Sequence, residues 1–153
     1  MQFPALKEAA KLDTNKRRLF IGAYGFEPRT LGWVHFQEGQ GGILNKTVMF
    51  RYIHSKGRNR ISDLRKALAN FGAPTPIDIP HDWLSPHDIE NKLSRKLVQN
   101  LADVEEIVLD ISSMTKLLIL VSLYMLSDFE GTLRIVYSES ERYAPTKEEY
   151  DKS

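Results

Sequence analysis

The sequence predicts an open, doubly wound α/β domain, a mostly parallel sheet of about five strands with helices on both faces. Short apolar segments alternate with amphipathic segments along the chain, and strict alternation of strand and helix favours a parallel sheet. The 153 residues fit one ordinary domain, and 42% hydrophobic with 27% charged residues is typical of a globular protein. The absence of cysteine from the sequence excludes disulfide bonds, thiolate metal sites and a cysteine nucleophile.

The first predicted strand, residues 18–24, is a short apolar run between charged residues and glycine, which is typical of a buried strand. Pro28 suits the first position of a helix, because the first turn does not use the N–H that proline lacks. We expect this helix to place Leu31, Val34 and His35 on one side.

A second strand and a second helix follow. Residues 47–53 are rich in β-branched and aromatic residues and predict a strand. Ser62 is a residue type that caps helices, and we expect it to begin a helix that stops at Gly72. Residues 77–79 lie between prolines, so they form at most a short or edge strand, because proline cannot donate to a ladder.

The second half of the chain continues the alternation. Ser85 followed by Pro86 predicts the cap and first position of a helix. Its apolar stripe repeats every four residues, at Ile89, Leu93, Leu97 and Leu101. Residues 106–111 are almost continuously apolar, as in a strand covered on both faces. A buried helix ending near Phe129 and a last strand at 132–137 complete the pattern.

We expect residues 1–153 to form a single Rossmann-like domain, with a helical segment at 1–17 and a polar tail at 138–153. A capping-box pattern at 146–149 begins a helix as the chain stops, so we expect a further C-terminal region. The N-terminus has no apolar core of signal-peptide length, and the longest apolar stretch, 117–126, is too short to cross a membrane. We therefore predict a cytoplasmic protein with no membrane contact.

Ligands of open parallel sheets bind outside the carboxyl ends of the strands, so the loops that follow strands are the candidate sites. The first such loop offers glycines for close backbone approach and a helix start that can bind an anion. Its candidate ligand-binding residues are Gly22, Tyr24, Gly25, Arg29 and Thr30. The alternative is a plain strand-to-helix turn, and the spacing does not match the GxGxxG dinucleotide fingerprint.

The second candidate loop spans residues 110–116. Ser112, Ser113 and Thr115 supply hydroxyl groups at a helix start, where the helix dipole favours negative charge. Lys116 opposes that dipole, which indicates that the lysine has another role, and an anion would provide one. The alternative is ordinary helix capping. No GxxxxGK[ST] motif is present, so the sequence does not predict a P-loop NTPase.

The third candidate loop spans residues 137–143. Glu139 is a candidate for binding a ribose hydroxyl or for acting as a general base, and Tyr137 and Tyr143 are candidates for contacting the ligand, Tyr143 by stacking on a base. Glu27, in the first loop, forms an acid/base pair with Glu139 only if the two loops converge. The alternative is a solvated acidic loop.

Charge is unevenly distributed along the sequence. Residues 1–60 carry 11 Lys and Arg against 4 Asp and Glu, whereas residues 61–153 carry 10 against 16. Within the basic half, Lys56, Arg58 and Arg60 are candidates for nucleic-acid contact, and a solvated loop is the alternative. The histidines lack a further clustered ligand set, so the sequence predicts neither a metal site nor a bound cofactor.

The loop Asp110-Ile111-Ser112-Ser113-Met114-Thr115-Lys116 resembles the Asp-hydrophobic-Thr/Ser-Gly-Gly-Thr-Lys loop of CRISPR-associated Rossmann-fold (CARF) sensor domains. The resemblance implies a homodimer that binds cyclic oligoadenylate across its interface, with Ser112, Thr115 and Lys116 contacting phosphate or ribose. Some domains of this family also cleave the ring. Ser113 and Met114 stand where the family has two glycines, which narrows the space for a phosphate.

Three functions follow from these patterns. The first is a nucleotide-sensing module of a prokaryotic defence-type system, homodimeric, for a cyclic oligonucleotide or another phosphate-containing ligand. The second is an enzyme that hydrolyses a phosphodiester or glycosidic bond of a nucleotide, with Glu27 or Glu139 as base and Lys116 stabilising charge. The third is a nucleic-acid or protein-binding subunit of a larger complex.

Overall fold

The computed structural model describes Leu12 and residues 15–25, 28–37, 44–53, 61–70, 75–81 and 85–139. Its strands are β1 (Arg18–Ala23), β2 (Lys46–Tyr52), β3 (Ile77–His81), β4 (Glu106–Asp110) and β5 (Thr132–Val136). Its helices are the 3₁₀ helix η1 (Pro28–Leu31), α1 (Gly32–Gln37), α2 (Ile61–Asn70), α3 (Pro86–Asn100) and α4 (Lys116–Met125).

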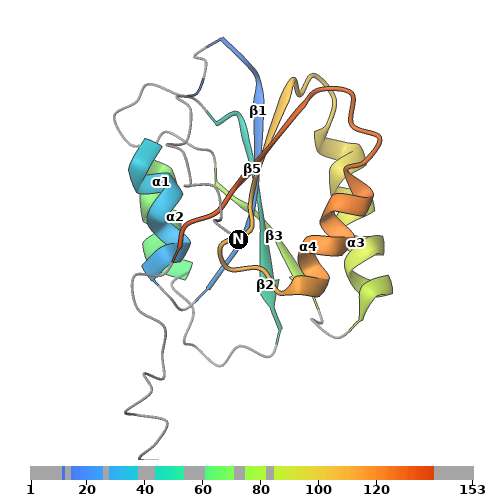
Figure 1. Ribbon diagram of the computed structural model, residues 1–153, viewed down its shortest axis with the longest axis horizontal. Helices are drawn as coiled ribbons and strands as arrows, with labels where there is room; N and C mark the ends of the chain where they lie inside the picture. Colours follow the sequence, from blue (N-terminus) through green and yellow to red (C-terminus); the bar gives the residue numbers. More distant parts are fainter. Residues whose placement is uncertain are drawn as a thin grey trace, which may run out of the picture.

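The five strands form one parallel sheet in the order β3-β2-β1-β4-β5. Helices α1 and α2 lie on one face of this sheet and α3 and α4 on the other (Figure 1). The predicted doubly wound α/β fold is therefore confirmed. The strand order reverses direction between β1 and β4, which makes the carboxyl ends of these two strands the topological switch point of the sheet.

Both faces of the sheet are buried, which explains why its central strands are almost continuously apolar. In β1, Leu19 and Ile21 pack with the α3 and α4 side, whereas Phe20 packs with the α1 and α2 side. All five residues of β4 are buried. Full burial of one large apolar side chain stabilises the fold by about 1.5–3 kcal/mol. The two apolar layers therefore hold the central strands in place, and with them the loops at the ends of these strands.

Helix α3 begins as the sequence predicts. The Ser85 hydroxyl caps it by accepting from the Asp88 N–H at 3.3 Å, and Pro86 occupies the first turn. The stripe Ile89, Leu93 and Leu97 is buried against the sheet. A helix with a side-chain cap and a regular apolar stripe is specified locally, and here its bounds agree with the sequence pattern.

The segment after β1 differs from the prediction. Pro28–Leu31 forms a 3₁₀ helix, and the α-helix α1 begins only at Gly32. Within α1, Val34 is buried and His35 is exposed, because adjacent residues of an α-helix point about 100° apart, so the prediction that they share one side was wrong. Trp33 and Val34 are buried instead, and the Trp33 ring stacks on Phe20 with centroids 5.3 Å apart.

Two further boundaries are settled by the structure. Helix α2 already includes Ile61, so Ser62 lies within its first turn and is not the cap that we predicted. Strand β3 is an edge strand, as its prolines predict, and the Pro80 carbonyl accepts from Lys92 Nζ at 2.7 Å. The predicted helix end at Gly72 lies outside the described residues.

Several predicted features fall on residues that the structure does not describe: Glu27, Lys56, Arg58, Arg60, Tyr143 and the helix expected from residue 146. Leu12 and residues 15–17, the described part of the predicted N-terminal helical segment, are not helical. Within the described part of the chain, no helix is long and apolar enough to cross a membrane.

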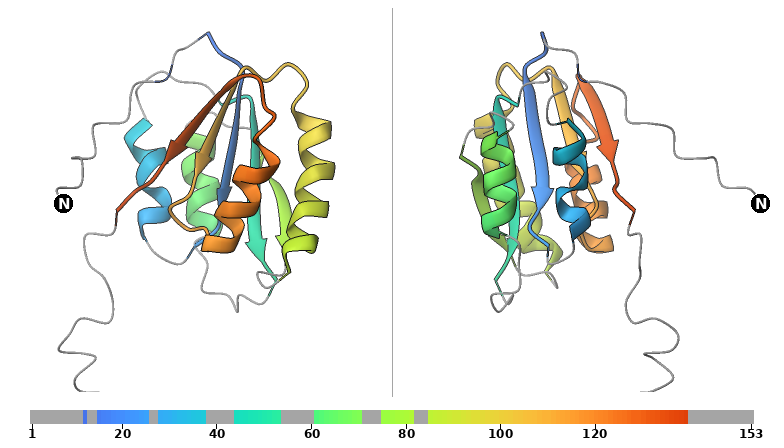
Figure 2. Two further views of the ribbon diagram at one scale, coloured as in Figure 1. Left: turned by 45° about the vertical axis from the view of Figure 1, so that its right-hand side comes forward. Right: turned by 90° about the vertical axis from the view of Figure 1, so that its left-hand side faces the viewer.

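The helices run antiparallel to the strands, as the two views of Figure 2 show. The carboxyl ends of the strands therefore lie at the same edge of the domain as the start of α4. This carboxyl edge gathers the three loops that the sequence singles out.

Candidate functional site

The loops after β1 and β4 touch each other at the switch point. The hydroxyl groups of Thr30 and Ser113 share a hydrogen bond at 2.5 Å. Gly25 makes the contact possible, because a Cβ atom there would lie 2.5 Å from Ser113 Oγ and 2.6 Å from Thr30 Oγ1. A larger residue at position 25 would therefore collide with these side chains. The structure brings together the loops after β1 and β4, which we predicted to share a ligand.

The loop after β4 is organised around a buried carboxylate. Asp110 Oδ1 accepts from the Ser112 backbone N–H at 2.9 Å and from the Ser112 hydroxyl at 2.5 Å. The Ser112 hydroxyl in turn accepts from the Ser138 N–H at 2.8 Å, which ties this loop to the segment after β5. Ser112 is only 3% exposed, so its role in this structure is to connect the two segments.

Asp110 has an unusual titration. Burial raises the pKa of its carboxyl from 3.8 to about 6, and the two hydrogen bonds from Ser112 oppose this rise. Asp110 is 5% exposed and lies at the carboxyl end of β4, one of the two strands that form the switch point. A carboxyl group at the site therefore changes its protonation state within one or two pH units of neutrality.

The start of α4 is capped twice. Thr115 is the N-cap, and its Oγ1 accepts from the Leu118 N–H at 3.2 Å. The Tyr52 hydroxyl, at the end of β2, accepts from the Thr115 N–H at 3.2 Å and donates to the Ser113 carbonyl oxygen at 3.3 Å. These contacts fix the loop geometry before any ligand binds.

Two backbone donors remain at this helix start. Within the described residues, the N–H groups of Lys116 and Leu117 have no hydrogen-bond partner. Lys116 itself is exposed, and no ion pair joins it to another described residue. The helix dipole and the Lys116 ammonium both favour an anion at this point.

The segment after β5 closes the third side of the site. Arg29 Nη1 donates to the Tyr137 hydroxyl at 3.3 Å, and the guanidinium carbon lies 6.0 Å from the centre of the Tyr137 ring. A Cβ atom at Gly32 would lie 2.6 Å from Ser138 Oγ, so α1 and this segment are in close contact. Glu139 is exposed, and its predicted pairing with Glu27 falls outside the described residues.

Tyr24 is engaged in a separate polar cluster. Its hydroxyl donates to Asp78 Oδ1 at 2.7 Å and accepts from Arg65 Nε at 3.1 Å. Burial and the Asp78 carboxylate raise the pKa of Tyr24 to about 12, against the opposing effect of Arg65. This cluster links β1 to β3 and α2, so the Tyr24 hydroxyl is already fully used in holding the sheet.

Gly22 has a packing role. A Cβ atom there would lie 2.9 Å from Phe20 Cε1 and 3.3 Å from the Met49 sulfur, within the α1 and α2 layer of the core. Of the residues predicted from the first loop, Gly25, Arg29 and Thr30 therefore reach the contacts around the switch point, whereas Gly22 and Tyr24 are used in the sheet itself.

Sequence reasoning missed three residues of the site: Asp110 as a titrating group, Tyr52 and Ser138. Asp110 ends a buried apolar run, and a carboxylate at that place is a detectable signal of a special role. Tyr52 and Ser138 carry no comparable local signal, because their importance depends on contacts with Ser113, Thr115 and Ser112.

No family model matches the chain, and no curated protein matches its sequence.

Proposed function

We propose that the chain is a nucleotide-sensing module that binds a phosphate-containing ligand of the cyclic oligonucleotide class at the carboxyl edge of the sheet. The observation that carries this proposal is the Thr30–Ser113 contact, which joins the loops after β1 and β4 at the switch point. Open α/β sheets bind their ligands in that place.

The chemistry of the α4 start supports a phosphate ligand. The Lys116 and Leu117 N–H groups are available to an anion, and the Lys116 side chain adds a full positive charge beside them. Phosphate oxygens at a helix start gain both hydrogen bonds and a favourable helix dipole. The exposed Tyr137 ring, held by Arg29, offers a surface on which a base can stack.

The same contacts suggest how binding is sensed. A phosphate that approaches the α4 start competes for the donors now paired between Thr30 and Ser113 or held by Tyr52. Because Ser112 is joined to Ser138, a shift of this loop moves the segment after β5. A ligand that prefers the shifted arrangement changes the populations of the two states, which is what a sensor requires.

Exposed apolar side chains favour self-association of the sensor. Leu120 and Tyr124, four residues apart on α4, are 66% and 72% exposed, and Ile135 on the edge strand β5 is 50% exposed. Large exposed apolar side chains, such as the adjacent Leu120 and Tyr124 on one side of α4, are frequent at protein–protein interfaces. We propose a homodimer through this surface, in a prokaryotic defence-type system, as the resemblance to CARF domains implies.

The hydrolase alternative places its general base at Glu27 or Glu139. Glu139 is exposed after β5, and Glu27 lies outside the described residues, as do the basic residues of the nucleic-acid alternative, Lys56, Arg58 and Arg60. We prefer sensing because of the contact between the loops that hold Thr30 and Ser113.

A thermal-shift panel tests the proposal. Cyclic oligoadenylates, cyclic dinucleotides, NAD, ATP and short RNA are compared at matched concentration and salt. A ligand at about 100 times its dissociation constant raises the unfolding free energy by about 2.7 kcal/mol. We expect one cyclic nucleotide class to raise the melting temperature. The rise is lost in Lys116→Ala and kept in Lys66→Ala, which changes an exposed lysine on α2.

The outcomes separate the three functions. If the ligand raises the melting temperature of Lys116→Ala as much as that of the wild type, Lys116 does not contact the ligand and the proposed geometry is wrong. Product formation from the bound nucleotide indicates the hydrolase. A shift with RNA alone, weakening steeply with salt, indicates the nucleic-acid-binding subunit.

A further inference from the structure

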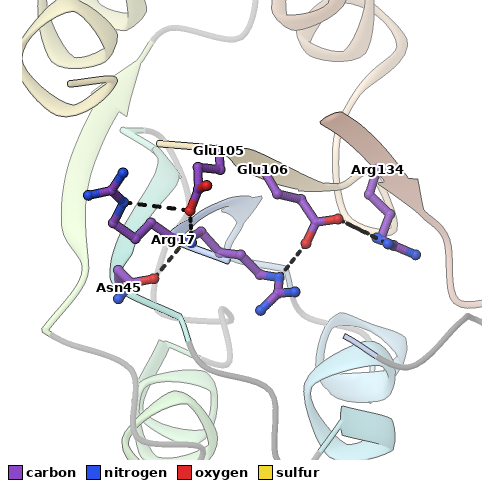
Figure 3. Close-up of polar contacts among 6 residues, drawn as sticks. Arg17, Asn45, Glu105, Glu106 and Arg134 are labelled. Atoms are coloured by element: carbon purple, nitrogen blue, oxygen red, sulfur yellow. Dashed lines mark hydrogen bonds and ion pairs between the residues drawn. The ribbon is translucent and has the colours of Figure 1, made fainter. Parts of the chain in front are cut away.

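A second polar cluster lies at the amino edge of the sheet, opposite the candidate nucleotide site. Arg18 begins β1, Glu106 begins β4 and Arg134 lies in β5. Arg18 Nε donates to Glu106 Oε2. Arg134 Nε donates to Glu106 Oε1 at 3.0 Å, and Arg134 Nη2 lies 2.9 Å from the same oxygen (Figure 3). One carboxylate thus serves two guanidinium groups.

The cluster carries an unbalanced positive charge. Arginine is always protonated in proteins. Burial alone would raise the pKa of Glu106, but the hydrogen bonds from Arg18 and Arg134 outweigh burial and lower that pKa, so the carboxylate is ionised. Arg18 and Glu106 are both fully buried. Two positive charges therefore meet one negative charge: Arg18 and Glu106 are shut off from solvent, whereas the Arg134 side chain is 29% exposed. Excess positive charge beside a buried ion pair is costly unless another negative charge or solvent is near.

The buried donors of Arg18 are also unsatisfied. Within the described part of the chain, its terminal nitrogens Nη1 and Nη2 have no hydrogen-bond partner. Gln37, the last residue of α1, is fully buried as well, and neither its Nε2 nor its Oε1 has a partner there. Buried polar groups are almost always hydrogen-bonded, so the three nitrogens, Arg18 Nη1 and Nη2 and Gln37 Nε2, indicate a missing acceptor.

Arg18 and Gln37 belong to the same layer. Side chains alternate between the two faces of a strand, so Arg18 shares the face of Phe20, which stacks on Trp33 of α1. Gln37 lies four residues after Trp33, on the same side of α1. Because α1 runs antiparallel to β1, its last residue lies toward the amino edge, where β1 begins (Figure 2).

We propose that this layer holds a small monovalent anion, of the halide, nitrate or formate class, bound by Nη1 and Nη2 of Arg18 and by Nε2 of Gln37. Such an anion supplies both the acceptor that the three nitrogens lack and the charge that Glu106 alone does not balance. A water molecule supplies an acceptor but no charge. The anion stabilises the domain at the edge remote from the nucleotide site.

The melting temperature of the full chain tests this site. Chloride, nitrate or formate replaces gluconate, a bulky anion, at constant ionic strength. We expect a saturable rise of about 5–10 °C at about 100 times the dissociation constant. Arg18→Met removes this rise, whereas Arg17→Met keeps it, because Arg17 is the adjacent arginine and is exposed beside Glu105. Lys116→Ala also keeps it, which separates this site from the nucleotide site.

A second measurement covers the case in which Arg18→Met fails to fold. The ³⁵Cl line width in a chloride solution broadens when wild-type protein is added, and excess nitrate reverses the broadening. Gln37→Leu weakens the broadening at least several-fold, and Arg17→Met leaves it unchanged. A melting temperature that does not depend on the anion, together with no broadening, overturns the proposal. An equal dependence in Arg17→Met and Arg18→Met overturns it as well.

Discussion

The Tyr52 hydroxyl accepts a hydrogen bond from the Thr115 N–H at 3.2 Å, although the strands before these residues, β2 and β4, are separated in the sheet by β1. Tyr52 reaches across the end of β1 to the loop that begins α4. Its side chain thereby fixes the candidate ligand loop from a strand that does not adjoin it. Burial raises the pKa of this phenol, so it stays protonated and can also donate to the Ser113 carbonyl oxygen.

Tyr52→Phe removes both of these hydrogen bonds and leaves a partly buried donor and acceptor without this partner. We expect the free energy of unfolding in urea to fall by about 1–3 kcal/mol. Thr132→Val is the control, because it also removes a hydroxyl group and Thr132 is exposed, and its effect stays within about 0.5 kcal/mol. Equal effects of the two variants would show that Tyr52 does not hold the loop.

Gly25→Ala places a methyl group 2.5 Å from Ser113 Oγ, closer than van der Waals contact allows. The two loops must then separate, and we expect the free energy of unfolding to fall by about 1–3 kcal/mol. Ser113→Gly removes Ser113 Oγ and Cβ and leaves Thr30 Oγ1 2.6 Å from the added methyl group, so the double variant recovers part of the loss. A double-mutant cycle in urea measures this coupling, and strictly additive effects would argue against the contact between the loops.

The stability of the protein depends on pH through Asp110. Its folded pKa of about 6 lies above its ordinary value of 3.8, so the folded state binds the proton more tightly than the unfolded state. Protonation of Asp110 therefore contributes to the free energy of unfolding. This contribution, about 3 kcal/mol in total, is fully present below pH 3.8 and is lost as pH rises through about 6.

Asp110→Asn removes the titrating group and keeps an oxygen that can accept from Ser112. The wild type loses the Asp110 contribution between pH 4 and pH 8 and the variant does not. We therefore expect the unfolding free energy of the variant to rise relative to that of the wild type over this range. Chemical denaturation at a series of pH values measures this difference. A difference that is constant with pH would mean that Asp110 titrates alike in the folded and unfolded chains.

Glu105 and Glu106 are adjacent and offer a matched pair of variants. Glu106→Gln leaves the guanidinium of Arg18 buried without its counter-ion, which we expect to lower the free energy of unfolding by about 3–5 kcal/mol. Glu105→Gln breaks only the exposed contact with Arg17, where the nitrogen and oxygen are 3.6 Å apart, and has a much smaller effect. Comparable losses from the two variants would contradict the central role assigned to Glu106.

Local patterns predicted most of the fold. The Ser85 cap, the stripe from Ile89 to Leu97 and the buried run of β4 depend on neighbours in the sequence, and the structure confirms them. The 3₁₀ helix Pro28–Leu31, which precedes α1, was not predictable in this way. Such a turn depends on how the segment packs against the sheet.

The candidate site was predictable only in part. The rule that ligands bind at the carboxyl ends of parallel strands selected the loops containing Thr30 and Ser113, which the structure brings into contact. Tyr24 shows the limit of this reasoning, because its partners Arg65 and Asp78 lie on α2 and β3. A single sequence does not reveal which of several polar residues at one sheet edge pair with each other.

The central position of β1 has a consequence for how the chain folds during synthesis. Arg18 pairs with Glu106, 88 residues later, whereas the other neighbour of β1 is the nearby strand β2. On the ribosome, the backbone N–H and C=O groups along one edge of β1 therefore stay unpaired until β4 has emerged. Unpaired strand edges associate with other chains. We infer that nascent chains ending before residue 106 depend most on chaperones, and that this long-range pairing sets the folding rate of the domain.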